Sequence, residues 1–557
     1  MLINKLKYTL FGIAILLAGC TDLSETLRSD ISADVYYSNV DGFEDLTKAM
    51  YQPLIMYYIG THGSMATSSG TDLFRNGASG ASRAAYHSYD SGLNPSISGN
   101  GPHQVWNHFY RGINLANSVI DRADDVDGIT ENLKNRRVAE ARFLRAHYYH
   151  ILVQNWGDVH LTLEETTGVE TEATRTPEED IWAVVIEDLK FAADNLPIDQ
   201  SDVGRATANA ARHHLARVHL ILENWDEAAN WATEVINSGQ YSLIDSFTEL
   251  WDPYETPIGG YNDETIWGIT KNHETGGAAI AREYTSDVRN LPGIQATWHI
   301  GNSSSRYRAN DYFVTEIFNN DPARTDVPNH WNDERYQASF KDVWYYNHPA
   351  SLPSGVALGD TAAYLPAAKK YQEMSDEEVA EYEEKHNYHL YRIQDWHNRL
   401  WLSISYKFRY RGDETPETSL SALGWWPPGY TDRTVPVFRL AETYLIAAEA
   451  HMMMGNSGQA AEYFNTVRQR AETPGHEIPL VSPGDLDIDE ILDERARELA
   501  GEFLRWYDLK RTGKFMERIQ AHNPEAGPNV QEYHMLRPIP QAQIDRTTNE
   551  YPQNPGY

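Results

Sequence analysis

The sequence predicts a mainly α-helical protein, with a scaffold of paired helices and one irregular, loop-rich lobe. Two observations predict the scaffold. Apolar residues recur at helical spacing through much of the first half and near the C-terminus, and two distant segments share a helix–turn–helix pattern. A third observation predicts the lobe, because the region between those two segments is rich in Gly, Pro, Asn and Trp and has few long periodic runs.

Three helices have clear start and stop signals. Residues 135–157 carry an apolar stripe that ends at a glycine, and residues 177–197 begin with a proline and acidic residues and end at a proline. Near the C-terminus, apolar residues recur at spacings of 4, 3, 4 and 3: Leu492, Ala496, Leu499, Phe503 and Trp506. With Asp487 as N-cap and Gly513 as the stop, this stripe predicts one continuous helix.

The two similar segments are residues 215–236 and 447–468. When they are aligned, Ala216 lies opposite Ala448 and His219 opposite His451. Small residues at such positions let paired helices approach closely, as in tetratricopeptide (TPR) repeats. Each copy is degenerate, so we predict TPR-like helix pairs that neighbouring helices complete.

Four segments follow along the chain. We predict a leader over residues 1–19 and an N-terminal helical region over 20–250 that includes a loop at about 60–100. A variable lobe follows over 251–433, and a C-terminal helical region over 434–557. A long irregular segment inside a compact protein is usually functional, so the lobe is a candidate for binding.

The N-terminus resembles a lipoprotein signal. Lys5 and Lys7 precede an apolar stretch from Tyr8 to Ala18, which is too short to span a bilayer but suits a secretory signal. The chain's single cysteine, Cys20, follows in the sequence LAGC, which is similar to a bacterial lipobox. We therefore expect Cys20 to be the acylated first residue of the mature chain and to anchor it to a membrane. The alternative is an ordinary signal peptide with a chance cysteine.

Charge and composition exclude some functions. The formal net charge is −33, from 47 basic and 80 acidic residues, which argues against nucleic-acid binding and against adhesion to anionic lipid. Tyr (34) and Trp (15) together far outnumber Phe (15). Their flat apolar faces and polar handles suit sugar rings, although a large helical protein also uses many tyrosines in its core.

No catalytic or metal motif is present. The acids Asp485, Asp487 and Asp489 lack the glycine and glutamate that a calcium loop needs, and helix capping explains them. The pairs His147/His150 and His213/His214 are expected to be structural helix histidines rather than metal ligands. We find no phosphate-binding loop, no nucleophile elbow and no cysteine nucleophile. The sequence therefore offers no catalytic residue, cofactor site or metal site by motif, and a carboxylate pair for glycoside hydrolysis would be recognised only in space.

Several segments together resemble the SusD/RagB family of surface glycan-binding lipoproteins. Beside the lipobox, these are WNHFYRGINLANSVID (106–121), AEARFLRAHYYHILVQNWGDV (139–159), VPVFRLAETYLIAAEA (435–450), ILDERARELAGEFLRWYDLKRTGKF (491–515) and LRPIPQAQIDRTTNEYPQNPGY (536–557). The last two are the most specific. The similarity runs from end to end in the right order, and it is weakest in the middle third, where ligand choice is made in this family.

The resemblance implies a non-enzymatic protein with a TPR-like scaffold and a SusD-like ligand-binding lobe. It implies a lipid-anchored position on the cell outer membrane, facing the exterior, beside a SusC-like TonB-dependent porin that imports the captured glycan. By their position in the family, two segments are candidates for ligand contact. Their candidate residues are Asp72, Arg75, Tyr86 and Tyr89 in residues 71–92, and Trp298, His299 and Tyr307 in the variable segment. We expect Trp106, Tyr110, Trp506 and Tyr507 to belong to the core.

Two alternatives from other classes remain open at this point. A surface glycoside hydrolase would need a carboxylate pair in a cleft, and a TPR adaptor would bind a protein on its helical face. Which glycan is bound is also open. The net charge disfavours highly anionic glycans, but local arginines such as Arg75, Arg83, Arg306 and Arg308 could reverse that preference.

Overall fold

The structure is a computed structural model of the whole chain. It describes residues 33–77, 81–99, 101–199, 202–251, 260–270, 284, 291–294, 306–318, 333–396, 401–402, 404, 407, 434–473 and 475–557. The predicted leader, Cys20, Trp298 and His299 lie outside these residues.

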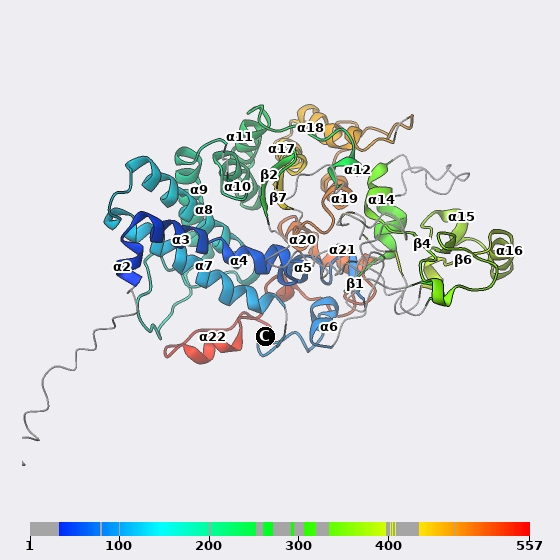
Figure 1. Cartoon of the computed structure of the whole chain (residues 1–557), viewed down its shortest axis with the longest axis horizontal. Helices are drawn as coiled ribbons and strands as arrows, with labels where there is room; N and C mark the ends of the chain where they lie inside the picture. Colours follow the sequence, from blue (N-terminus) through cyan, green and yellow to red (C-terminus); the bar gives the residue numbers. More distant parts are fainter. Residues whose placement is uncertain are drawn as a thin grey trace, which may run out of the picture.

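Helices dominate the N-terminal region (Figure 1). They are α2 (Ala33–Tyr37), α3 (Val40–Ala49), α4 (Gln52–Leu54), α5 (His62–Thr67), α6 (Ala81–Ser88), α7 (Pro102–Arg122), α8 (Glu131–Trp156) and α9 (Glu178–Asn195), with a π-helical turn over Ile55–Ile59. The predicted helix at 135–157 is confirmed as α8. Its N-cap is Thr130, whose side chain accepts a hydrogen bond from the backbone amide of Leu133. The helix ends at Gly157, which has a φ of 68°. The predicted helix at 177–197 is confirmed as α9.

The two TPR-like segments form helical hairpins, as predicted. One consists of α10 (Ala208–Ile221) and α11 (Trp225–Ile236), and the other of α17 (Leu440–Met453) and α18 (Ser457–Arg470). Helix α11 packs against α17, so the hairpins are neighbours, and α7, α8, α9 and α10 continue the row. Ala216 and Ala448 are fully buried, which agrees with close approach of the helices at these positions.

The prediction of a single helix between Asp487 and Gly513 is wrong. Asp487 caps α19 (Ile488–Leu499) as expected, but the chain then breaks and resumes as α20 (Arg505–Arg511), followed by α21 (Phe515–His522). Gly501 and Phe503 adopt left-handed φ values of 80° and 65°. The break lets Glu502 accept a bond from Arg439 Nε at 2.7 Å inside the core. A buried ion pair and tertiary packing therefore outweigh the helical periodicity of this segment.

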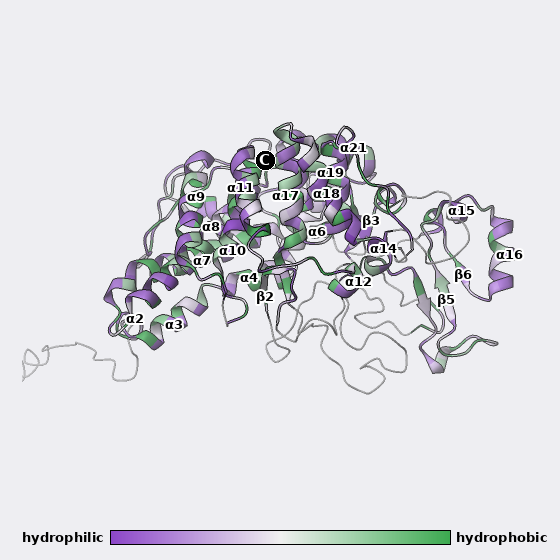
Figure 2. Ribbon diagram, turned by 90° about the horizontal axis from the view of Figure 1, so that it is seen from above, coloured by the Kyte–Doolittle hydropathy of each residue, from purple (hydrophilic) through white to green (hydrophobic). Residues whose placement is uncertain are grey.

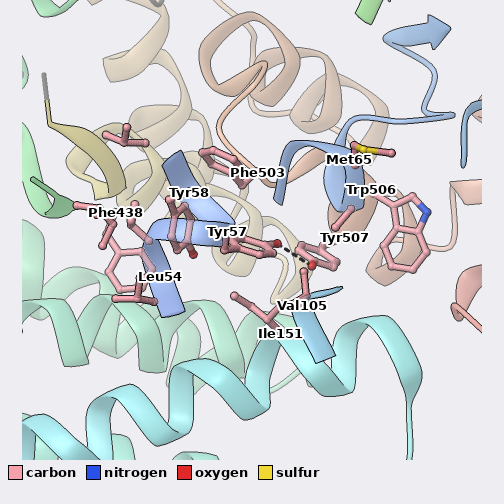
Figure 3. Packing of buried hydrophobic residues seen from close by; sticks show 14 of the residues in the cluster. Leu54, Tyr57, Tyr58, Met65, Val105, Ile151, Phe438, Phe503, Trp506 and Tyr507 are labelled. Atoms are coloured by element: carbon pink, nitrogen blue, oxygen red, sulfur yellow. Dashed lines mark hydrogen bonds between the residues drawn. The ribbon is translucent and has the colours of Figure 1, made fainter. Parts of the chain in front are cut away.

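The main hydrophobic core joins the N-terminal helices to the C-terminal region (Figure 3). Tyr57 and Tyr507 share a hydrogen bond of 3.0 Å between their hydroxyls, and Phe503 packs edge-on against Tyr58. The predicted core positions of Trp106, Trp506 and Tyr507 are confirmed, since all three are buried. Tyr110 is partly buried against the same core, and its hydroxyl donates to the His160 carbonyl at 2.8 Å.

The described parts of residues 251–433 contain short strands and helices between loops. Strand β2 (Thr265–Ile269) pairs antiparallel with β7 (Val435–Arg439). A three-stranded sheet in the order β4 (Val343–Tyr345), β5 (Thr361–Tyr364), β6 (His389–Leu390) carries α15 (Lys369–Gln372) and α16 (Asp376–His386). This small sheet lies at the end of the molecule opposite α2 (Figures 1 and 2). The remaining elements are α12 (Phe247–Leu250), β1 (Phe74–Asn76), β3 (Tyr307–Ala309), a π-helical turn (Phe313–Ile317), α14 (Glu334–Ser339) and α22 (Gln541–Arg546).

Candidate ligand-binding site

The two predicted ligand segments meet in a two-stranded ribbon. Strand β1, from the first segment, pairs antiparallel with β3, from the variable region, in the register Phe74↔Ala309, Arg75↔Arg308 and Asn76↔Tyr307. Successive side chains of a strand point to opposite faces, whereas residues directly opposite each other share a face. Arg75 and Arg308 therefore lie on one face of this ribbon, and Phe74 and Tyr307 on the other.

The inner face of the ribbon is anchored in the core. Phe74 and Tyr307 are both buried. The ring of Tyr307 stacks on Tyr284 with centroids 4.6 Å apart, and its hydroxyl donates to Ser64 Oγ at 3.1 Å. These contacts fix the ribbon to α5, so the outer face is held in a defined place.

The outer face presents two partly exposed arginines. Arg75 donates from Nη2 to Asp311 Oδ1 at 3.1 Å, and the Asp311 side chain is more than half exposed. The guanidinium of Arg308 lies 5.7 Å from the centre of the buried ring of Trp396, which follows the β4–β5–β6 sheet in the chain. Close by, the Glu525 carboxylate accepts the backbone amide of Asn76 at 2.8 Å. The face thus presents positive charge and hydrogen-bond donors, and the ring of Trp396 is buried beneath Arg308.

Three other predicted site residues are enclosed in the protein. Asp72 is fully buried and bonded to Arg505. Tyr86 is buried with its hydroxyl 3.1 Å from His103 Nδ1, and Tyr89 is buried and accepts a bond of 3.2 Å from Trp506 Nε1. Burial raises the pKa of both tyrosines. A side chain so enclosed offers no surface to a glycan, so these residues, like Tyr307, position the site from behind.

Arg75 is thus the one predicted residue among the described ones that lies at an accessible surface. Arg308 was predicted only as a local positive charge, and Trp396 was not among the predicted site residues. The alternation in Tyr307, Arg308 and Ala309 was the available signal, because a cation between two apolar residues is typical of a strand with one solvated face. The partner strand of such a short segment cannot be deduced from periodicity.

A cavity of about 600 Å³ lies apart from the ribbon, beside α3 and α4. Its lining comes from α3, α4, residues 202–205 and the end of β2. The charged groups at its rim are already engaged: Arg205 Nη1 bonds Glu140 at 2.8 Å, and Lys48 pairs with Asp45 at 3.4 Å. With its apolar floor, this cavity offers few uncommitted groups to sugar hydroxyls.

The helix histidines form a buried cluster. His214 Nε2 and His150 Nδ1 are 3.1 Å apart, with the ring of His147 beside them. His213 contacts Glu442 through Nε2 at 3.2 Å and Thr443 through Nδ1 at 2.8 Å. Burial lowers the pKa of His150 to about 3, so the ring is neutral at pH 7. Across the described residues, no group of three or more His, Cys, Asp or Glu side chains is arranged to hold a metal ion.

None of the helices within the described ranges has both the length and the apolar character needed to cross a bilayer.

Comparison with known proteins places the chain in a family. The model of the SusD family matches residues 234–557, and a model described as "Starch-binding associating with outer membrane" matches residues 32–220. Because the first match covers more than half of the chain, the protein belongs to the SusD family. The resemblance seen in the sequence is therefore confirmed.

Relatives and solved structures agree with this assignment. The chain is 26% identical to SusD-like protein P25 of Formosa agariphila, over 80% of this chain and 79% of that protein. It is 25% identical to the starch-binding protein SusD of Bacteroides thetaiotaomicron, over 78% of this chain and 75% of that protein. A structure titled "Laminarin binding SusD-like protein" has 24% sequence identity and a TM-score of 0.68, and covers 94% of this chain and all of its own. The SusD-like fold predicted from the sequence is thus confirmed.

Proposed function

We propose that this protein binds glycans at the surface of the outer membrane and delivers them for import. Membership of the SusD family carries the proposal, since matched relatives and structures include proteins named for starch, laminarin and surface-glycan binding. The ribbon supplies the geometry: an accessible outer face with two guanidinium groups, held by a buried inner face and by the buried ring of Trp396 beneath Arg308. Such guanidinium donors bind the hydroxyls and other oxygen atoms of sugars.

The finer parts of the proposal concern anchoring and partners. Cys20, as the acylated first residue, would tether the chain by lipid, and a SusC-like TonB-dependent porin would receive the glycan. The family description "associating with outer membrane" supports this location. We propose no catalytic step: the protein captures and releases its ligand unchanged.

Affinity electrophoresis of the mature chain in gels containing a panel of polysaccharides tests the binding. We expect one or more polysaccharides to retard the protein, with weaker retardation for Arg75→Ala and for Trp298→Ala, the second residue being a sequence-based candidate. A reducing-end assay on the same mixtures distinguishes capture from hydrolysis, and sustained release of reducing ends would contradict the proposal. Retardation by none of the polysaccharides would also count against it.

Anchoring and partnership have separate tests. Metabolic labelling with a palmitate analogue should mark the wild-type chain and leave Cys20→Ala unlabelled. Co-purification from detergent-solubilised outer membranes should recover a TonB-dependent porin with the tagged wild-type chain. If the Cys20→Ala variant is still labelled, lipid anchoring through Cys20 is contradicted. If the wild-type chain is recovered without such a porin, the proposed partnership is contradicted.

A further inference from the structure

The outer face of the ribbon places two positive charges in direct opposition. Arg75 and Arg308 are register partners of an antiparallel pair, so their side chains leave the same face about 5 Å apart at Cβ. Like charges in this arrangement are destabilising. The arrangement also occurs in a chain whose formal net charge is −33. An unfavourable local arrangement on an accessible face points to a role other than stability.

Nearby carboxylates neutralise the positive charges of Arg75 and Arg308 only in part. Arg75 has Asp311 as its partner at 3.1 Å. Among the described residues no carboxylate forms an ion pair with Arg308, and its Nε is buried without a hydrogen-bond partner. Burial, and then the charge of Arg75, lower the pKa of Arg308 to about 10, and the more distant carboxylates of Asp311 and Glu525 offset this only in part.

Other arginines of this chain have their charge neutralised by several carboxylates. Arg439, which is buried, contacts Glu264, Glu498 and Glu502 at 2.6–2.7 Å. Arg335, also buried, contacts three carboxylates within 3.1 Å. Arg308 differs from Arg439 and Arg335, because no carboxylate among the described residues forms an ion pair with its guanidinium.

The missing partner has a definable chemistry. A guanidinium presents a planar fork of donors that matches the oxygens of a carboxylate or a sulfate, whereas a neutral hydroxyl cannot neutralise its charge. Two guanidinium groups on one face can bind one such anion together. The aromatic ring of Trp396 lies beneath the guanidinium group of Arg308 and holds it in place by a cation–π contact. Building on the proposed glycan binding, we propose that Arg75 and Arg308 form a subsite for an anionic sugar, a sulfate ester or a uronate carboxylate.

Affinity gels with polysaccharides of known charge test this subsite. The probes are carrageenan for sulfate, alginate for carboxylate and laminarin as a neutral glucan, run with the mature chain. Because the protein's overall charge repels polyanions, retardation by an anionic probe requires a local site. We expect carrageenan or alginate to retard the wild type, with affinity at least about tenfold lower for Arg75→Ala and Arg308→Ala and falling with salt. Chemical desulfation of carrageenan or carboxyl reduction of alginate should abolish the effect and so identify the group.

Matched variants keep the test independent of folding. Arg546→Ala removes an exposed arginine on α22 and should bind like the wild type. Arg308→Gln keeps much of the side chain's bulk, and because it relieves repulsion its melting temperature should not fall. Retardation by laminarin alone, or equal anionic binding by wild type, Arg75→Ala and Arg308→Ala, would overturn the anionic subsite while leaving glycan binding intact. Retardation by no probe and by no polysaccharide of the wider panel would overturn the proposed function, and the subsite with it.

Discussion

Arg505 on α20 binds the carboxylate of Asp72 with two hydrogen bonds, from Nε at 2.8 Å and from Nη2 at 2.5 Å, across 433 residues of sequence. Asp72 comes just before strand β1, so this pair ties the ribbon to the C-terminal helices. Burial alone would raise the pKa of Asp72, but the charges of Arg505 and Arg518 lower it below its ordinary range. The C-terminal segment that identifies the family thereby supports the candidate site.

Breaking this pair should destabilise the protein strongly. We expect Asp72→Asn to lower the free energy of unfolding by about 3–5 kcal/mol, because it leaves Arg505 buried without its counter-charge. Asp311→Asn, which removes the exposed partner of Arg75, is the matched control and should cost at most about 1 kcal/mol. Urea unfolding followed by circular dichroism measures both. Similar losses for the two variants would mean that the Asp72 pair is not a structural anchor.

The buried histidines should make stability depend on pH below neutrality. Burial holds the pKa of His150 at about 3 and that of His214 well below its ordinary value, whereas both titrate near 6.5 in the unfolded chain. Since the unfolded state then binds more protons, stability is complete above about pH 6.5 and is lost as pH falls from there toward 3. Each group contributes up to about 1.4 kcal/mol per pH unit in that window.

Melting temperatures between pH 7.5 and 5 check this expectation. The wild type should melt lower at pH 5, and His150→Gln should show a flatter profile. The carboxylates act in a lower window: burial opposes ionisation of Glu494, but Arg335, Arg497 and Arg468 hold its pKa at about 2, so its contribution is lost only as pH falls below about 4. An unchanged slope in His150→Gln would show that the histidine is not responsible.

The sequence predicted the helical scaffold well because its signals are local. The cap Thr130, the stop Gly157 and the paired alanines Ala216 and Ala448 lie within or beside the helices they define. The candidate site was harder to predict because it depends on partners far away in the chain. Nothing near Asp72 indicates its bond to Arg505, so a buried anchor and an accessible ligand group looked alike in the sequence.

The break after α19 was also missed because it depends on a distant partner, Arg439, and it gives a further prediction. Gly501 has φ of 80°, where a side chain is strained, so Gly501→Ala should lower stability by about 1–2 kcal/mol. In contrast, an added Cβ at Gly458 within α18 would meet open space, and Gly458→Ala should raise stability by about 0.5–1 kcal/mol. Opposite shifts in the urea midpoint would confirm both conformations. A stabilising Gly501→Ala would instead favour the continuous helix that the apolar periodicity predicted.

Close packing of the helix hairpins can be tested with a larger side chain. Ala448→Leu places extra volume where α17 is fully buried and should cost about 1–3 kcal/mol. The control is Ala183→Leu on the exposed face of α9, which should change stability by less than about 0.5 kcal/mol. If both variants have the same melting temperature as the wild type, α17 is not closely packed at this position.

The most direct test of the account is a crystal structure of the mature chain with an oligosaccharide from the polysaccharide that retards it. The account predicts sugar density on the outer face of the β1–β3 ribbon, with an anionic substituent about 3 Å from the guanidinium groups of Arg75 and Arg308. Sugar bound only in the 600 Å³ cavity beside α3 and α4, with the ribbon face empty, would contradict it.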